Sequence, residues 1–177
     1  ELFNEIRDRI KEEIRFIIDV AGRISETDCI QSFAHAATVN GYIKPVINSS
    51  SSVSIKGGRH PVVEVNLPPG EFISNDFSLQ SGKQNLLMLT GPNMAGKSTF
   101  LRQNAIIVLM AQTGSFVPAE EAEIGVVDKI FCRVGASDNL ARGESTFLVE
   151  MSETANILRG ATQNSFVIMD EVGRGTG

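Results

Sequence analysis

The chain of 177 residues is 42% hydrophobic and 21% charged, an ordinary composition for a folded globular domain. Its net charge of −5, from 16 basic and 21 acidic residues, argues against this segment being a DNA-gripping surface, because such surfaces carry clustered positive charge. No run approaches the roughly 18 apolar residues that a membrane span requires, so no membrane partner is expected.

The first forty residues predict an arm of two helices. In residues 2–24, apolar side chains recur every three or four positions and form one stripe of an amphipathic helix. Ser25 and Asp28 resemble a capping box that starts a second helix, and Asn40-Gly41 supplies a left-handed stop after it. We therefore predict an antiparallel helical hairpin. The apolar stripe comprises Phe3, Ile6, Ile10, Ile14, Ile17, Ala21 and Ile24.

The serine run after Asn48 is the predicted domain boundary, since four serines in a row favour a solvated turn. Residues 1–47 are thus assigned to the helical arm and residues 48–177 to a globular domain. In that domain short apolar runs alternate with helical patterns, which predicts an α/β fold with a largely parallel sheet covered on both faces. The predicted strands are 53–55, 62–65, 72–73, 86–90, 129–134 and 165–170, and the predicted helices are 97–113 and 146–158.

Between the strand 86–90 and the helix 97–113 lies a glycine-rich loop of the form G-x-x-x-x-G-K-[ST]. Such a loop turns its backbone N–H groups inward around a polyanion, and the helix that follows directs the positive end of its dipole at the phosphates. Lys97 can reach the β- and γ-phosphates, and the Ser98 hydroxyl can ligate Mg²⁺. The loop therefore predicts binding of ATP or ADP together with Mg²⁺. Its nine residues are Gly91, Pro92, Asn93, Met94, Ala95, Gly96, Lys97, Ser98 and Thr99.

The apolar run 165–170 closes on two carboxylates, Asp170 and Glu171, the second element that a P-loop ATPase needs. A central strand ending there delivers Asp170 to the Mg²⁺ shell through water, and the following residue can polarise the attacking water. Glu171 is therefore the predicted general base. A glutamate directly after the aspartate indicates the ABC-like class of ATPases rather than the small GTPases.

At this point two segments become recognisable: GPNMAGKST at 91–99 and SFVIMDEVGRGT at 165–176. Together with the stretch between them, they resemble the MutS family of DNA mismatch-repair ATPases. The resemblance covers most of residues 58–177, and the arm at 1–40 resembles the end of that family's lever, which joins the ATPase to a DNA clamp. It implies a P-loop NTPase of the ABC-ATPase type that hydrolyses ATP.

The resemblance also implies roles for residues around the nucleotide. Asn93 would contact the γ-phosphate, stabilise the charge that develops there, and join Lys97 and Glu171 as a catalytic residue. Phe72 would stack on adenine, together with the backbone around Ile73. Packing of Phe72 inside a core or strand is the alternative interpretation.

A further implied site serves a neighbouring subunit. Ser145 resembles the signature serine of ABC ATPases, which touches the γ-phosphate held by the other protomer. It stands before the predicted helix 146–158, so its hydroxyl and the helix dipole form an anion-binding end, although an ordinary N-cap is the alternative. Asp138 and Arg174 are expected near the same dimer interface.

The implied function is an ATPase that switches a DNA-bound clamp on mismatches, with a second MutS-type subunit in a homo- or heterodimer. Mismatched duplex DNA would be contacted by domains outside this chain, and downstream repair factors are further expected partners. A bacterial source would place the protein in the cytoplasm, associated with the nucleoid. Cys29 and Cys132 show no CxxC spacing and are expected to be buried thiols in a reducing intracellular compartment.

Two alternatives remain open. The chain stops inside a glycine-rich stretch, so it is also consistent with a truncated, non-catalytic nucleotide-binding piece that is weak or inactive alone. The other alternative is the ATPase of a related branch that acts on recombination intermediates. The segment RVGASDNLARGESTFLVEM looks more like the mismatch-repair branch.

Overall fold

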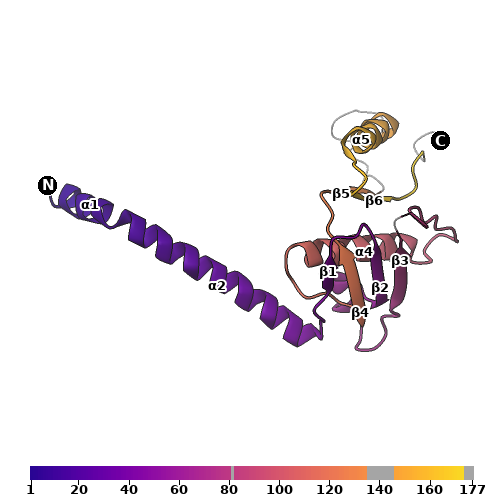
Figure 1. The fold of residues 1–177 in the computed structure, drawn as a ribbon, viewed down its shortest axis with the longest axis horizontal. Helices are drawn as coiled ribbons and strands as arrows, with labels where there is room; N and C mark the ends of the chain where they lie inside the picture. The colour runs from indigo at the N-terminus through magenta and orange to yellow at the C-terminus, as the bar shows by residue number, and fades with distance from the viewer. Residues whose placement is uncertain (81, 135–145, 174–177) are drawn as a thin grey trace. The chain divides into compact units, whose positions relative to one another are not determined.

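The computed structural model describes residues 1–80, 82–134 and 146–173 of the chain. The chain divides into two compact units, Glu1–Asn40 and Gly41–Gly177. The first unit is helical, and the second is a mixed α/β unit with small sheets (Figure 1). In the described ranges, no helix combines the length and the unbroken apolar character needed to cross a bilayer.

The first unit consists of α1 (Leu2–Glu12) and α2 (Ile14–Asn40), which are separated only at Glu13. The predicted hairpin is wrong, because α2 continues through Ser25 as one helix (Figure 1). No glycine or proline lies between residues 23 and 31 to break it. The Thr27 hydroxyl instead donates to the carbonyl of Arg23 at 2.8 Å, a bond between successive helical turns.

The end of α2 agrees with its prediction. The helix stops at Asn40, and Gly41 adopts φ +61°, the left-handed conformation that glycine accommodates without a steric penalty. Along the two helices Ala37 is the one buried residue. The predicted apolar stripe therefore remains largely exposed within this unit, with Phe3, Ile10 and Ile24 at 77%, 49% and 64% exposure.

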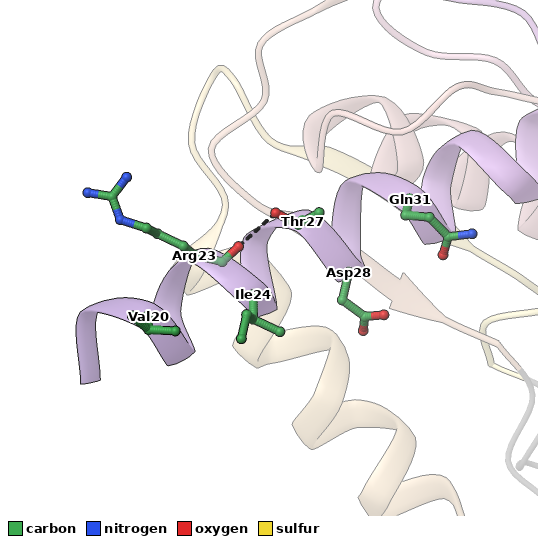
Figure 2. A pocket seen from close by; sticks show the side chains of 6 residues that line it. All are labelled: Val20, Arg23, Ile24, Thr27, Asp28 and Gln31. Carbon is green, nitrogen blue, oxygen red and sulfur yellow. Dashed lines mark hydrogen bonds between the residues drawn. The ribbon is translucent and has the colours of Figure 1, made fainter. Parts of the chain in front are cut away.

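A hollow of about 440 Å³ lies along the middle of α2. Figure 2 shows that all of its lining side chains project from this one helix. It is therefore a groove between neighbouring side chains on a helix surface, and it does not bring segments distant in sequence together as a binding cleft would. Its lining residues are Val20, Arg23, Ile24, Thr27, Asp28 and Gln31.

The described strands of the second unit form two sheets. The larger has the order β1-β4-β2-β3; β1 and β4 are parallel, whereas β2 is antiparallel to both of its neighbours. The smaller is the parallel pair β5-β6. The fold is therefore mixed α/β, and the predicted largely parallel sheet is not what these strands form. Their bounds are β1 Val46–Asn48, β2 Val53–Gly58, β3 Asn75–Leu79, β4 Glu121–Gly125, β5 Ile130–Arg133 and β6 Phe166–Met169.

The boundary between the units lies earlier than the predicted one at residues 47 and 48. Ile43 pairs with Val117 in an isolated bridge, and β1 pairs with β4. Residues 41–47 therefore belong to the second unit, because Ile43 and β1 make backbone hydrogen bonds with segments far along the chain.

In the described part of the second unit, three helices accompany the sheets. The predicted helices 97–113 and 146–158 are confirmed as α4 (Lys97–Gln112) and α5 (Thr146–Gly160). The predicted strand 62–65 is wrong, since Pro61–Glu64 form the short helix α3, with proline at its first turn. Helix α4 contacts β2, β5 and β6, and α5 contacts β5.

The core lies where α4 meets both sheets. Phe77 of β3 is central to it: its ring makes edge contacts with those of Phe100 and Phe166, with both pairs of centroids 6.0 Å apart. The predicted strand 53–55 is confirmed as part of β2, and the predicted strands 129–134 and 165–170 are confirmed in β5 and β6, which are one residue shorter at each end. The largest apolar side chains that are almost fully buried are Ile55, Ile107, Val108, Val117 and Ile124.

Two other predicted strands are wrong. Residues 72–73 form no strand, and β3 begins at Asn75 instead. Residues 86–90 also form no strand, although they are apolar: Leu86 and Met88 are 77% and 79% exposed. A strand requires a neighbour to receive its backbone hydrogen bonds, and no described segment pairs with residues 86–90.

The two cysteines, Cys29 and Cys132, are free, as expected from their spacing, but both are exposed rather than buried. Cys29 lies on α2, where most side chains are exposed, and Cys132 lies on β5, at the edge of a two-stranded sheet.

His60 caps α3, and we predict that the stability of this helix depends on pH. Its Nδ1 accepts from the Val63 N–H at 3.3 Å, and burial together with the nearby Arg102 cation lowers the pKa of His60 below 6.5. The neutral ring is thus favoured in the folded state. The stabilisation that neutral His60 contributes is therefore fully present above pH 6.5, the ordinary pKa of the ring, and is lost as the pH falls through the lowered pKa of the folded state. We expect the α3 amides to exchange faster at about pH 5.5 than in a His60→Asn variant, whose amide still caps the helix, with a much smaller difference at about pH 7.5. Hydrogen exchange of the peptide covering α3 measures this; equal protection of both proteins at both pH values contradicts it.

Candidate functional site

A hollow of about 540 Å³ is formed jointly by the glycine-rich loop and the turn after β6. The loop contributes six residues and the turn contributes Glu171. The fold thus joins two motifs that are far apart in sequence, and both were predicted as parts of one site. The lining residues are Asn93, Met94, Gly96, Lys97, Ser98, Thr99 and Glu171.

The loop ends at the N-terminus of α4 in a conformation suited to an anion. Gly96 caps the helix with φ +85°, a left-handed conformation, and contributes no capping side chain. The first turn of α4 contains no acidic residue. The positive end of the helix dipole and its early N–H groups are therefore not countered by a carboxylate, as a phosphate site requires.

The left-handed backbone of Gly96 makes a testable prediction. A Cβ added at Gly96 would meet no atom within 4 Å, so Gly96→Ala is sterically possible and its cost comes from the backbone alone. We expect this variant to destabilise the loop by about 1–2 kcal/mol and to weaken ATP binding about tenfold. The control is Gly22→Ala in α2, also without close neighbours, which should stabilise the helix by about 0.5–1 kcal/mol. Titration with a fluorescent ATP analogue checks this; unchanged affinity after Gly96→Ala contradicts it.

Lys97 folds back onto its own loop. Its Nζ donates to the carbonyl of Gly91 at 2.9 Å and to that of Pro92 at 2.7 Å. These bonds hold the first and last parts of the loop together and place the ammonium at the hollow. An ammonium has three N–H groups, so one is available for a ligand while both carbonyl contacts persist.

Two non-glycine residues that line the hollow have a positive φ: Met94 at 63° and Glu171 at 49°. Such conformations cost about 1–3 kcal/mol and persist only where the surroundings enforce them. Their concentration at one hollow is typical of a functional site. The sequence motif predicted the positions of both residues but not their strained backbone.

The two predicted acids occupy different environments. Asp170 is buried, and its backbone N–H donates to the carbonyl of Arg133 at 2.7 Å, which continues the β5–β6 pairing. Glu171 is exposed and lines the hollow, whereas Asp170 is not among the lining residues. Because the chain turns outward after β6, the first of the two adjacent carboxylates is buried and the second is accessible to solvent.

A hydrogen-bonded cluster secures the opposite end of the β5–β6 pair. The Asp128 carboxylate accepts from the Thr162 hydroxyl at 2.6 Å and from the Ser165 hydroxyl at 2.8 Å. These two bonds lower the pKa of Asp128 below its usual value, because they favour the charged carboxylate. The cluster links the residues just before β5 to those just before β6, so it supports the strand that ends at the acid pair.

The two residues predicted to receive adenine, Phe72 and Ile73, do not line the hollow. Ile73 is 83% exposed and Phe72 is partly buried, and neither is a lining residue. Ser145, Asp138 and Arg174 lie outside the described residues.

The hollow is chemically suited to a nucleotide with Mg²⁺. Ser98 and Thr99 contribute hydroxyls, and Lys97 contributes a cation. Among the described residues, no three His, Cys, Asp or Glu side chains gather into a group able to hold a metal. Mg²⁺ in phosphate sites uses only one or two protein ligands, the rest being water and phosphate oxygens, so this donor set fits.

Sequence reasoning missed one buried acid near the site. Glu150 of α5 is only 3% exposed, and its Oε1 accepts from the backbone N–H of Gly173, in the turn that follows Glu171. The available signal was a charge inside the apolar run Phe147–Met151 of a predicted helix. Such a residue is seldom buried without a partner.

A family model and several curated relatives all relate this chain to MutS proteins. The model of the MutS domain V family matches residues 87–177. The chain is 60% identical over 180 residues to the DNA mismatch repair protein MutS of Treponema pallidum (strain Nichols), an alignment covering 99% of this chain and 20% of the relative. It is 56% identical over 176 residues to the protein of the same name from Lachnoclostridium phytofermentans, covering 99% of this chain and 19% of the relative.

A third relative, the DNA mismatch repair protein MutS of Clostridium kluyveri (strain NBRC 12016), is 56% identical over 174 residues, covering 98% of this chain and 20% of the relative. The chain thus spans about a fifth of the length of the curated relatives that it matches. The family match includes both motifs that line the hollow and extends across more than half of the chain. The chain belongs to the MutS family of DNA mismatch-repair proteins.

Proposed function

We propose that this chain is an ATP-binding and ATP-hydrolysing module of the ABC-like P-loop class within a mismatch-repair protein. The observation that carries the proposal is the shared hollow, where Lys97 and the N-terminus of α4 face the same space as Glu171. The Lys97 ammonium and the N–H groups at the start of α4 can hold phosphates there, and the Glu171 carboxylate can act on a water molecule beside them.

In this proposal the loop residues 91–99 surround the phosphates with backbone N–H groups, and Lys97 neutralises charge at the β- and γ-phosphates. Asn93 donates to the γ-phosphate. Mg²⁺, when bound with the nucleotide, neutralises the phosphate oxygens, and Ser98 together with Asp170 through water is its proposed protein ligand set. Phe72 and the backbone around Ile73 are proposed to receive adenine.

Glu171 is the proposed general base. Its exposed carboxylate lines the hollow and can accept a proton from a water molecule that attacks the γ-phosphate. Asp170, buried at the end of β6, is protected from that water and suited to an outer-shell role at the ion. The difference in accessibility supports the assignment of two roles to two neighbouring acids.

The same proposal gives the chain a partner. A second MutS-type subunit would supply Ser145 to complete the site, and the helical arm would relay closure of the pair to domains that hold mismatched duplex DNA. Downstream repair factors would respond to that state. The names of the three relatives support the mismatch-repair branch over the branch that acts on recombination intermediates.

A non-catalytic reading of the isolated segment also has an observation in its favour. Residues 86–90, directly before the loop, are apolar and exposed and have no strand partner in the described part of the chain. Because the segment before the loop has no strand partner there, we expect the loop to be held loosely. A loosely held loop can bind a nucleotide, but it does not hold the γ-phosphate in the orientation that hydrolysis requires. We therefore assign turnover to the full-length protein.

The test is Mg²⁺-dependent hydrolysis of ATP by the full-length protein, measured in single turnovers with and without substitutions at Lys97 and Glu171. The proposal would be supported if the unsubstituted protein binds ATP saturably and hydrolyses it, and if each substitution slows hydrolysis. Hydrolysis that neither substitution alters would reject it, and so would binding without hydrolysis by the unsubstituted full-length protein. Nucleotide binding without hydrolysis by the isolated segment would support the non-catalytic interpretation of that segment.

A further inference from the structure

We propose that Glu150 is a positioning residue that holds the turn carrying Glu171 in its working geometry, an inference that rests on the proposed role of Glu171 as general base. Glu150 does not line the hollow, so it is not placed to touch a nucleotide. Its effect is exerted through the backbone of Gly173, two residues beyond Glu171.

The burial of Glu150 requires an explanation. Its side chain is enclosed on α5 at 3% exposure, where a carboxylate loses most of its hydration. The bond from the Gly173 N–H to its Oε1 supplies part of the lost stabilisation, and a bond to a charged acceptor is stronger than one between neutral groups. A buried acid that accepts a hydrogen bond from a turn amide is placed to hold that turn.

The turn itself needs to be held. Glu171 has φ +49° and Gly173 has φ +90°, so two of its three described residues are in left-handed conformations. The conformation is unfavourable for glutamate and easily varied at glycine, so neither residue defines the direction of the turn by itself. Contact with a packed helix can select one geometry from those that the turn can adopt.

Helix α5 has a second connection to the acid pair. Glu153, one turn beyond Glu150, pairs with the guanidinium of Arg133 at 3.0 Å, and Arg133 is buried in β5. The carbonyl of that arginine accepts from the Asp170 N–H. The same helix is therefore joined to the residue before Glu171 through Arg133 and to the turn after it through Glu150.

These two connections make the position of Glu171 depend on α5. Loss of the Glu150 acceptor would remove one restraint on the turn while leaving intact the glycine-rich loop, which is proposed to bind the phosphates. The consequence is a specific kinetic pattern: slower hydrolysis with unchanged nucleotide affinity. A merely structural role would lower the stability of the fold without separating these two quantities.

The test uses the full-length protein with Glu150→Met, which fills the space but accepts no hydrogen bond, and Glu150→Gln, which keeps an acceptor oxygen. We expect Glu150→Met to slow single-turnover ATP hydrolysis about 10- to 100-fold while the Kd for ATP stays within about twofold. Glu150→Gln should retain the unsubstituted rate within about threefold. The control on the exposed side of the same helix is Ser152→Ala, which should leave both quantities unchanged.

Three outcomes would overturn the inference: an unaltered rate in Glu150→Met, equal losses in the Met and Gln variants, or a parallel loss of ATP affinity. Should Glu150→Met fail to fold, Glu150→Ala carries the same expectations. Glu171→Gln is measured alongside. If Glu171→Gln hydrolyses ATP at the unsubstituted rate, the proposed function itself fails; if only the Glu150 variants do so, the positioning role alone fails.

Discussion

Replacing Lys97 by methionine in the full-length protein is expected to slow single-turnover ATP hydrolysis by about 100-fold or more, and to weaken the binding of ATP and ADP. Methionine keeps the aliphatic length and removes the ammonium. Of the described side chains that line the hollow, Lys97 is the one cation, so its loss leaves the triphosphate facing only dipoles and the carboxylate of Glu171. Rapid-quench hydrolysis and equilibrium titration measure the two effects.

The loop geometry sharpens this expectation. Lys97 also ties the carbonyls of Gly91 and Pro92, so a substitution removes two hydrogen bonds as well as the charge. The loop should therefore become more mobile even without nucleotide, which hydrogen exchange of residues 91–99 would detect. Lys83→Ala, at an exposed lysine in the turn before the loop, is the control and should change neither measurement. Normal affinity and rate in Lys97→Met would contradict the whole assignment of the site.

Glu171→Gln is expected to lower the single-turnover rate by about 100- to 10,000-fold, because the amide has nearly the shape of the acid but cannot accept a proton. Affinity for ATP should be retained within about threefold or increase, since the substitution removes a negative charge from the hollow proposed to hold the phosphates. This separation of rate from affinity distinguishes a general base from a residue that only binds.

The control for Glu171→Gln is Glu26→Gln, at an exposed acid on α2 outside the hollow, which should leave the rate unchanged. The two site substitutions should also differ from each other. Lys97→Met should impair both affinity and rate, whereas Glu171→Gln should impair the rate alone. Equal loss of affinity in both variants would mean that Glu171 supports the fold of the site and does not act on water.

The comparison of sequence and structure is most informative at the arm. Ser25 and Asp28 have the spacing of a capping box, yet α2 continues through both. A capping box stabilises a helix start only where the preceding backbone leaves the helix, and here the backbone stays helical from Ile14 to Asn40. The local pattern was real, but continuation of the helix was the more stable alternative.

The β structure shows a different limit. Strand β4 has alternating exposed glutamates and buried apolar residues, Glu121, Ala122, Glu123 and Ile124, but glutamate and alanine are weak strand formers and the segment was not predicted. Its formation depends on pairing with β1 and β2, both of which are more than sixty residues away. Conversely, the strongly apolar residues 86–90 form no strand in the absence of a described partner.

The sequence by itself determined the glycine-rich loop, the helix that follows it and the strand that ends directly before Asp170 and Glu171. Each depends on neighbours within a few positions: a glycine that permits a left-handed turn, a periodic apolar pattern, or a charge at the end of an apolar run. Only the tertiary structure decided that the loop and Glu171 share one hollow and that Glu150 contacts the turn beyond it. Those contacts join residues far apart in the chain, and their formation depends on packing of α4 and α5 against the strands, which no local pattern encodes.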